Sequence, residues 1–382
     1  MRVLFVLSIG HLSGGACSVW LNLMDGLRAF GVEPYAFMPT NKDDSLLNAL
    51  DERGIVHETA FFSWWTTADE SPRSLRHRLR RAGGKRLSAQ AEKRIAEMIR
   101  TYGIDVVFIC DGTITAGLEA AAACGVPAVW HFHEVIGAFE GAQRYLDSSA
   151  QVAAKLAQAD ALIAVSDYIA SNLAMLAPQA SVKRIYNGID ASNETFQELF
   201  SQETATFTLC GRIDNNKGQA EAIEAFSKVH EAFPNTRLLL VGEGERELTA
   251  RLKEQAARSS AATAIEFCGQ IEDMASIWAQ TDVALNCSFN EGCSMVLVEA
   301  LHAGRLVIAS DAPGNVELVA EGRGLSYERR NAADLARVMR EALEHQQQAK
   351  HIAAAGKCWA RENLTLHKQL EAVYAVFEGV VR

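Results

Sequence analysis

The sequence contains no run of about 18 apolar residues, the length that a membrane-spanning helix requires. It has no Cys-x-x-Cys pair among its eight cysteines, and a chain of 382 residues can build its core without a disulfide framework. Hydrophobic residues make up 49% of the chain and charged residues 22%, which is the balance of a globular protein and not of a disordered one. We therefore expect a protein of the reducing cytoplasm with room for two domains.

The chain also lacks an excess of positive charge, since its formal net charge is −10, and this argues against a nucleic-acid-binding protein. It contains no Asp-x-Asp, the usual carboxylate pair for a metal-bound diphosphate, so we expect neither a metal nor another cofactor. The first ten residues could be mistaken for a secretory signal, but their apolar run is short and leads into a glycine loop. A buried first strand is the better interpretation.

Short apolar runs alternate with longer amphipathic stretches along the whole chain. Strands that are apolar throughout and alternate with helices indicate parallel sheets covered on both faces. Two such series occur, separated by a polar stretch at 189–206. We therefore predict an α/β fold of two Rossmann-like domains, residues 1–190 and 191–362, with a helix over 363–382 that packs back on the first. The predicted strands are 3–7, 34–38, 105–110, 128–132, 161–165 and 182–185, then 207–210, 237–241, 265–268, 283–286, 306–309 and 324–327.

The strongest motif, Asn-Glu-Gly-Cys-Ser-Met-Val-Leu-Val-Glu-Ala, follows the fourth strand of the second series and contains Glu291 and Glu299. Ser294 is a candidate N-cap for the apolar helix after it, so the backbone N–H groups of Met295 and Val296 would face a ligand. Together with the positive end of the helix, these groups suit a diphosphate. The alternative is a loop glutamate and a helix-face glutamate without function, although an unpaired carboxylate among buried neighbours is costly.

A second motif, Gly-Arg-Ile-Asp-Asn-Asn-Lys-Gly, directly follows the first strand of the same series. Arg212 offers a planar fork of donors and Lys217 a compact charge, a suitable pair for two phosphates. Gly211 permits close backbone approach and Gly218 a turn into the next helix. A solvated basic turn is the alternative for this motif alone. Because both motifs follow strands of one predicted domain, together they favour a phosphate site.

The first domain carries two weaker signals at strand ends. Gly14 and Gly15 follow the first strand and let a backbone approach a phosphate or sugar closely, although a tight strand-to-helix turn explains them nearly as well. Another strand ends in Trp-His-Phe-His-Glu, whose alternation sends His131 and His133 to one face. Metal binding would need a third ligand, which nothing nearby supplies. His133 is therefore either a histidine that contacts substrate or a structural one.

These residues resemble the motifs of the retaining glycosyltransferases of family four, which have the GT-B fold. The family's two glutamates, separated by seven residues, are matched by Glu291 and Glu299, and its Gly-Arg…Lys-Gly element by 211–218. The resemblance covers nearly the whole chain and implies two parallel sheets that face each other across a cleft. The further matches are the glycine loop at 14–15, the histidine at 133, Asn-Gly-Ile-Asp at 187–190, Val-Gly-Glu-Gly at 241–244, which contains Gly242, and Ala-Pro-Gly-Asn-Val-Glu at 312–317.

The resemblance implies that the protein moves a sugar from a nucleotide diphosphate-sugar to an acceptor, with retention at the anomeric carbon and without a metal. Arg212 and Lys217 would hold the diphosphate, which the glycine loop of the first domain would also approach, and Glu299 the ribose hydroxyls. Glu291 would hold hydroxyls of the transferred sugar, and His133 would lie near that sugar; these two are the expected catalytic residues. We expect a UDP-sugar in preference to a GDP-sugar.

Two other functions fit the same residues. A nucleotide-sugar epimerase of the same fold could recruit Glu291 and His133 for proton transfer, and a non-catalytic module could bind a sugar nucleotide without reaction. The motif departs from the family's pattern at Cys293 and Ser294, which replace a more usual Phe-Gly and could reshape the sugar pocket.

Residues 61–94 combine nine Arg and Lys with the pair Trp64 and Trp65. Tryptophan suits a membrane interface, and clustered basic residues attract anionic headgroups. The segment therefore predicts peripheral contact of residues 64–94 with an anionic membrane, on its inner face, where the acceptor would be lipid-linked or a glycan. A solvated loop fits the sequence equally well.

Overall fold

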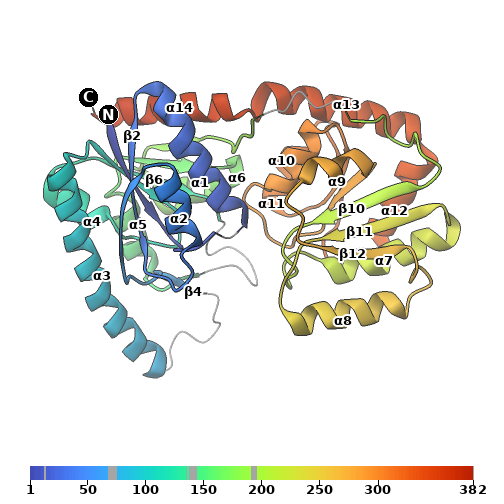
Figure 1. Cartoon of the computed structure of the whole chain (residues 1–382), viewed down its shortest axis with the longest axis horizontal. Coiled ribbons are helices and arrows are strands. Elements are labelled where there is room, and N and C mark those ends of the chain that lie inside the picture. Colours follow the sequence, from blue (N-terminus) through green and yellow to red (C-terminus); the bar gives the residue numbers. More distant parts are fainter. Residues whose placement is uncertain (13, 68–74, 135, 137–143, 191–195, 382) are drawn as a thin grey trace. The chain divides into compact units, whose positions relative to one another are not determined.

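The structure, a computed structural model, describes residues 1–12, 14–67, 75–134, 136, 144–190 and 196–381, and for residues 16 and 75–86 it describes the backbone alone. The chain forms two compact units (Figure 1). The first comprises Met1–Tyr186 together with Leu366–Arg382, and the second comprises Asn187–Thr365. The sequence placed these divisions at 190 and 362, a few residues away.

The first unit is built on a seven-stranded parallel sheet with the order β3-β2-β1-β5-β6-β8-β9. All residues of β5 (Val106–Cys110) and β6 (Ala128–Phe132) are buried, which explains their continuous apolar sequences. The other strands are β1 (Arg2–Leu7), β2 (Glu33–Pro39), β3 (Val56–Ala60), β8 (Ala161–Ala164) and β9 (Val182–Arg184), and β4 (Thr66–Thr67) pairs separately with β7 (Arg144–Tyr145). The helices are α1 (Gly14–Leu27), the short η1 (Arg28–Phe30), α2 (Ser45–Glu52), α3 (Leu75–Tyr102), α4 (Leu118–Cys124), α5 (Ser149–Leu156) and α6 (Asp167–Leu176).

The second unit contains a six-stranded parallel sheet with the order β12-β11-β10-β13-β14-β15. Phe207, Phe226 and Leu285 are fully buried in its core. Its strands are β10 (Ala205–Cys210), β11 (Thr236–Val241), β12 (Ile265–Gly269), β13 (Val283–Asn286), β14 (Leu306–Ser310) and β15 (Leu325–Tyr327). Its helices are α7 (Gln219–Ala232), α8 (Arg246–Ala257), α9 (Met274–Gln280), α10 (Met295–His302), α11 (Pro313–Val319), α12 (Ala332–Glu344) and α13 (Gln346–Asn363).

The last helix, α14 (Leu366–Val381), belongs to the first unit, although it follows the second in the chain. Its Leu370 side chain lies where a Cβ on Gly26 of α1 would be, so the absent side chain lets the two helices approach closely. Phe377 is fully buried and meets Phe108 of β5 edge to face, with ring centroids 5.1 Å apart. The first unit therefore depends on the end of the chain for part of its core.

Each strand predicted from the sequence is present within two residues at either end. The strand β3 was not predicted, because it lies at the sheet's edge and its sequence, VHETA, is polar and mostly half-buried. The two-residue strands β4 and β7 are too short to produce a periodic signal. The helix α3 begins at Leu75, and the sequence of its first half is strongly basic.

The prediction that Trp64 and Trp65 together form a membrane-facing pair is wrong for Trp65. Its side chain is only 6% exposed, its indole N–H donates to the Gly112 carbonyl over 2.7 Å, and its ring packs against Trp130. Trp64 is 41% exposed and donates to the Ser8 carbonyl. Within the described part of the chain, no helix is long and apolar enough to cross a membrane.

We predict that Phe377→Ala lowers the stability of the first unit by about 3–5 kcal/mol, because it removes a buried aromatic ring and leaves a cavity. Val381→Ala is the matched control, since Val381 lies on the same helix and is 47% exposed. Thermal unfolding followed by circular dichroism measures both. Equal midpoints for the two variants would show that α14 contributes little to the core.

Candidate active site

Two loops of the second unit meet at the carboxyl edge of its sheet. One follows β10 and carries Arg212 and Lys217, and the other follows β13 and carries Glu291. Because β10 and β13 are parallel neighbours, both loops leave the sheet at the same edge. Lys217 Nζ donates a hydrogen bond to Glu291 Oε1, although the two residues are 74 positions apart in the chain. The structure thus brings together two residues that the sequence assigned to one site.

The lysine–glutamate pair is largely shielded from solvent, with 26% of the Lys217 side chain and 13% of the Glu291 side chain exposed. Burial lowers the pKa of Lys217, but the adjacent Glu291 and Asp214 carboxylates outweigh burial and hold it above its ordinary value. Lys217 therefore stays charged at neutral pH, and the site keeps a fixed cation for an anionic group.

Arg212 is oriented by an aspartate that the sequence analysis did not single out. Its guanidinium pairs with Asp214 Oδ2 through Nε at 3.0 Å and Nη2 at 2.9 Å, while 73% of its side chain stays exposed. The other oxygen, Asp214 Oδ1, accepts from the backbone N–H groups of Asn216 and Lys217. Asp214 therefore shapes the loop and aims the guanidinium toward solvent, where a ligand can reach it.

The helix α10 begins after Ser294, as predicted, but the serine hydroxyl does not cap it. Instead the hydroxyl accepts a hydrogen bond from Asn286 Nδ2 over 2.7 Å. No capping bond from Ser294 therefore occupies the N–H groups of Met295 and Val296. The positive end of the helix and these two groups remain suited to an anion.

Glu299 lies within α10 among mostly buried neighbours, and this burial raises the pKa of its carboxyl to about 6, while the Trp278 indole opposes the shift. A hydrogen bond from a ligand hydroxyl stabilises a buried carboxylate, because it offsets part of the cost of removing the charge from water. Gly242, at the end of β11, has a φ of +131°, and a Cβ there would lie 2.2 Å from the Gly211 carbonyl oxygen. Only glycine fits this close approach between neighbouring strand ends.

The predicted residues of the first unit lie at the carboxyl ends of its own strands. Gly14 and Gly15 form the exposed start of α1, and Gly14 has a φ of +65°. His131 and His133 point to the same face, as predicted, with ring centroids 4.0 Å apart. Burial lowers the pKa of His133 to about 4 against the opposing charge of Asp111, so its ring is neutral at neutral pH.

Next to His133 lies a carboxyl pair that the sequence did not reveal. Asp111 Oδ2 accepts from the Ser8 hydroxyl over 2.6 Å, and Oδ1 accepts from the Thr113 backbone N–H over 2.7 Å. Burial raises the pKa of Glu134 well above its usual range, and the neighbouring Asp111 carboxylate raises it further. Burial and the adjacent charge thus favour the protonated form of Glu134, beside an aspartate that already has two donors.

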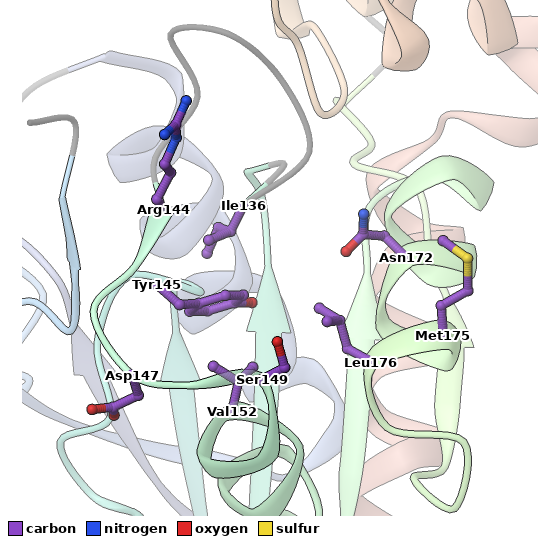
Figure 2. Close-up of a pocket in the computed structure, with 9 residues that line it drawn as sticks. All are labelled: Ile136, Arg144, Tyr145, Asp147, Ser149, Val152, Asn172, Met175 and Leu176. Carbon is purple, nitrogen blue, oxygen red and sulfur yellow. The ribbon is translucent and has the colours of Figure 1, made fainter. Parts of the chain in front are cut away.

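Among the residues that the structure describes, no group of three or more His, Cys, Asp and Glu side chains could hold a metal ion. A cavity of about 330 Å³ lies in the first unit, bordered by β7, α5 and α6 (Figure 2). No predicted donor-site residue lines this cavity. Its lining residues are Ile136, Arg144, Tyr145, Asp147, Ser149, Val152, Asn172, Met175 and Leu176.

Two parallel α/β units also occur in solved glycosyltransferases. A glycosyltransferase from Rickettsia africae superposes with a TM-score of 0.80 at 19% identity, over 100% of this chain and 98% of that one. Anabaena HepE in complex with UDP superposes with a TM-score of 0.79 at 20% identity, over 99% of this chain and 100% of that one. The fold is therefore the GT-B fold.

The sequence comparisons then give the family. Residues 13–193 match the family described as "Glycosyltransferase Family 4", and residues 190–359 match "Glycosyl transferases group 1". The chain belongs to the family-four glycosyltransferases.

Curated relatives match over part of their length. The phosphatidyl-myo-inositol mannosyltransferase of Mycobacterium tuberculosis is 34% identical over 156 residues, which are 39% of this chain and 40% of the relative. The glycogen synthase of the same organism is 30% identical over 190 residues, which are 49% of this chain and 44% of the relative. The chain thus aligns with about two fifths of the length of these proteins.

We predict that Glu299→Gln stabilises the ligand-free protein by up to about 2 kcal/mol at pH 7.5. The folded pKa of about 6 lies above the ordinary 4.5, so the ionised carboxyl favours unfolding. This penalty is complete above about pH 6 and disappears below about pH 4.5. Urea unfolding at pH 7.5 and 4.5 measures it, with the exposed Glu266→Gln as control. A gain that is the same at both pH values would contradict the prediction.

Proposed function

We propose that this protein is a retaining, metal-independent glycosyltransferase that moves a sugar from a nucleotide diphosphate-sugar to a hydroxyl of an acceptor. The observation that carries the proposal is the contact of Lys217 with Glu291, with Arg212 on the same loop as the lysine. A diphosphate needs fixed cations, and a sugar next to it needs a hydroxyl acceptor such as a carboxylate. This pair places one of each side by side.

In the proposed complex, Arg212 and Lys217 neutralise the diphosphate, and the N–H groups of Met295 and Val296 add the positive end of α10. The phosphate competes with Glu291 for the lysine, so donor binding releases the carboxylate to accept from hydroxyls of the sugar. Glu299 accepts from the ribose hydroxyls, and Gly242 leaves room at the neighbouring strand end, next to the base.

We assign proposed roles to three residues of the first unit as well. Gly14 and Gly15 expose backbone at the start of α1, which suits close approach to a phosphate. The neutral His133 offers one donor and one acceptor to the transferred sugar without adding a charge beside it.

The proposed chemistry follows from where charge develops. As the bond between the sugar and the leaving phosphate breaks, negative charge grows on that phosphate and positive charge on the sugar ring. Fixed Arg and Lys charges stabilise the leaving group, so a metal is not needed. The leaving phosphate takes the proton of the acceptor hydroxyl as the new bond forms on the same face, and the anomeric configuration is retained. No carboxylate nucleophile is assigned.

A UDP-sugar is the proposed donor, in preference to a GDP-sugar. The support is that the structural neighbour HepE was solved with UDP and also with UDP-glucose. The proposed acceptor is a glycan or a lipid-linked molecule. The support is that the sequence relatives include a glycogen synthase and a phosphatidyl-myo-inositol mannosyltransferase.

We predict that Lys217→Ala and Arg212→Ala each weaken UDP binding by about 10- to 100-fold, because each removes a charged contact to phosphate. Isothermal titration with UDP and GDP in the presence of EDTA measures the affinity and the base preference. Lys228→Ala is the matched control, since Lys228 is an exposed lysine of α7 that pairs only locally with Glu224.

Incubating the wild type with UDP-glucose then separates the candidate activities. Release of UDP as the glucosyl group passes to an acceptor or to water supports the proposal. Conversion of UDP-glucose to an epimer in the absence of an acceptor would contradict the proposal and indicate an epimerase. Tight binding of UDP-glucose without any turnover would contradict it and indicate a non-catalytic binding module.

We also propose that residues 64–94 contact an anionic membrane surface during acceptor recognition. The support is the basic start of α3 together with the half-exposed Trp64. We predict that anionic vesicles recover more protein on flotation than neutral vesicles, and that Arg80→Gln with Arg81→Gln reduces the difference. Equal recovery from both kinds of vesicle would contradict the proposal.

A further inference from the structure

The two loops of the site are joined by a side chain that has no role in the proposed chemistry. Asn216 precedes Lys217 in the loop between β10 and α7, residues 211–218, which we call the cationic loop. Its Nδ2 donates to the Asn290 carbonyl over 3.0 Å, and its Oδ1 accepts from the Asn290 backbone N–H, also over 3.0 Å. The Asn216 backbone carbonyl accepts from the Phe289 N–H over 2.8 Å. Three hydrogen bonds therefore tie the cationic loop to the two residues that precede Glu291.

A second asparagine, Asn315, acts on the Glu291 loop through Asn286, the last residue of β13. Asn315, in the first turn of α11, is fully buried, and its Nδ2 donates to Asn286 Oδ1 over 3.2 Å and to the Ser310 hydroxyl over 3.1 Å. Asn286 Oδ1 also accepts from the Ser288 backbone N–H. These two donors orient the Asn286 amide, so its Nδ2 faces Ser294 at the start of α10.

The chain of contacts ends on the glutamate itself. The Ser288 hydroxyl donates to Glu291 Oε1 over 2.8 Å, the same oxygen that accepts from Lys217. Beside Asn315, the Gly314 backbone N–H donates to the Glu291 carbonyl over 3.2 Å. A Cβ on Gly314 would lie 2.3 Å from the Gly292 carbonyl oxygen, so the start of α11 packs directly on the loop.

We infer that Asn216 and Asn315 are positioning residues that together fix the Glu291 carboxylate relative to the cationic loop and to the start of α10. The inference rests on the proposed function for its kinetic part. The rate of sugar transfer falls steeply when a carboxylate that must bind one particular sugar hydroxyl is displaced by about 1 Å. Asn216 restricts that displacement through its bonds to Asn290. Asn315 restricts it through Asn286, whose amide bonds Ser288 and Ser294 on either side of Glu291 in the chain.

The inference separates binding of the nucleotide from binding of the sugar. Arg212, Lys217 and Glu299 bind the nucleotide diphosphate directly, whereas Glu291 binds the transferred sugar, which UDP lacks. A displaced Glu291 should therefore weaken UDP binding less than UDP-glucose binding. UDP-glucose binding and turnover depend directly on where Glu291 lies. A variant that only weakens the fold would lower both affinities together at temperatures near unfolding and neither at temperatures well below it.

The test uses Asn216→Ala and Asn315→Ala in the full chain, well below their unfolding temperatures. Asn216→Leu keeps a side chain of similar size but has neither donor nor acceptor, so it separates hydrogen bonding from packing without adding a charge beside the diphosphate. Asn363→Ala is the matched control, because Asn363 lies in the same unit and its amide donates within its own helix, to the Trp359 carbonyl over 2.9 Å.

We expect the three variants at 216 and 315 to reduce kcat with UDP-glucose by about tenfold or more. Their UDP affinity should stay within about threefold of the wild type, and Asn363→Ala should change neither. Unchanged kcat, or equal losses of UDP and UDP-glucose affinity, would overturn the inference.

Hydrogen exchange of the backbone over 287–296 provides a readout that needs no donor. We expect faster exchange in the variants at 216 and 315 than in the wild type or in Asn363→Ala. Unchanged exchange overturns the inference even if activity falls. If the wild type neither binds UDP nor consumes UDP-glucose, the proposed function fails, while the exchange rates still decide whether the two asparagines hold the loop.

Discussion

In the second unit, parallel pairing of Phe207 with Val283 and of Leu209 with Leu285 brings the ends of β10 and β13 to one edge of the sheet. A polar loop follows each strand, so the two loops lie next to each other beyond that edge. The Lys217–Glu291 contact follows from this pairing, as do the bonds of Asn216 to Asn290. A different strand order would leave the same motifs intact in the sequence and far apart in space.

The charged residues of the site in the second unit are of two kinds, those that form an ion pair and one that does not. Glu291 and Arg212 each have a partner of opposite charge, Lys217 and Asp214. Among the described residues no cation pairs with Glu299, and burial raises the pKa of its carboxyl to about 6. That carboxyl is therefore the destabilised element of the site, and a group that donates to it relieves part of the cost.

In the first unit, burial shifts the pKa values of two neighbouring groups in opposite directions. It lowers the pKa of His133 to about 4, so its ring is neutral at neutral pH, and it raises the pKa of Glu134 well above its usual range. Asp111 beside them accepts from the Ser8 hydroxyl and from a backbone N–H. In the same unit, the composition of residues 61–94 predicted a surface role for a tryptophan that tertiary packing buries. Trp65 belongs to a basic, tryptophan-containing segment, yet it lies in the core against Trp130.

The sequence by itself determined the strands, the two-domain division and the positions of the charged motifs, because buried parallel strands are continuous apolar runs and the motifs follow them directly. It did not reveal β3, whose edge position permits a polar sequence. Only the tertiary structure decided that the Ser294 hydroxyl accepts from Asn286 and does not cap its own helix, and that Asn216 bonds Asn290 while Asn315 bonds Asn286. The physical reason is that a hydrogen-bond partner 29 or 74 residues away leaves no periodic trace in the chain, whereas burial of a strand does.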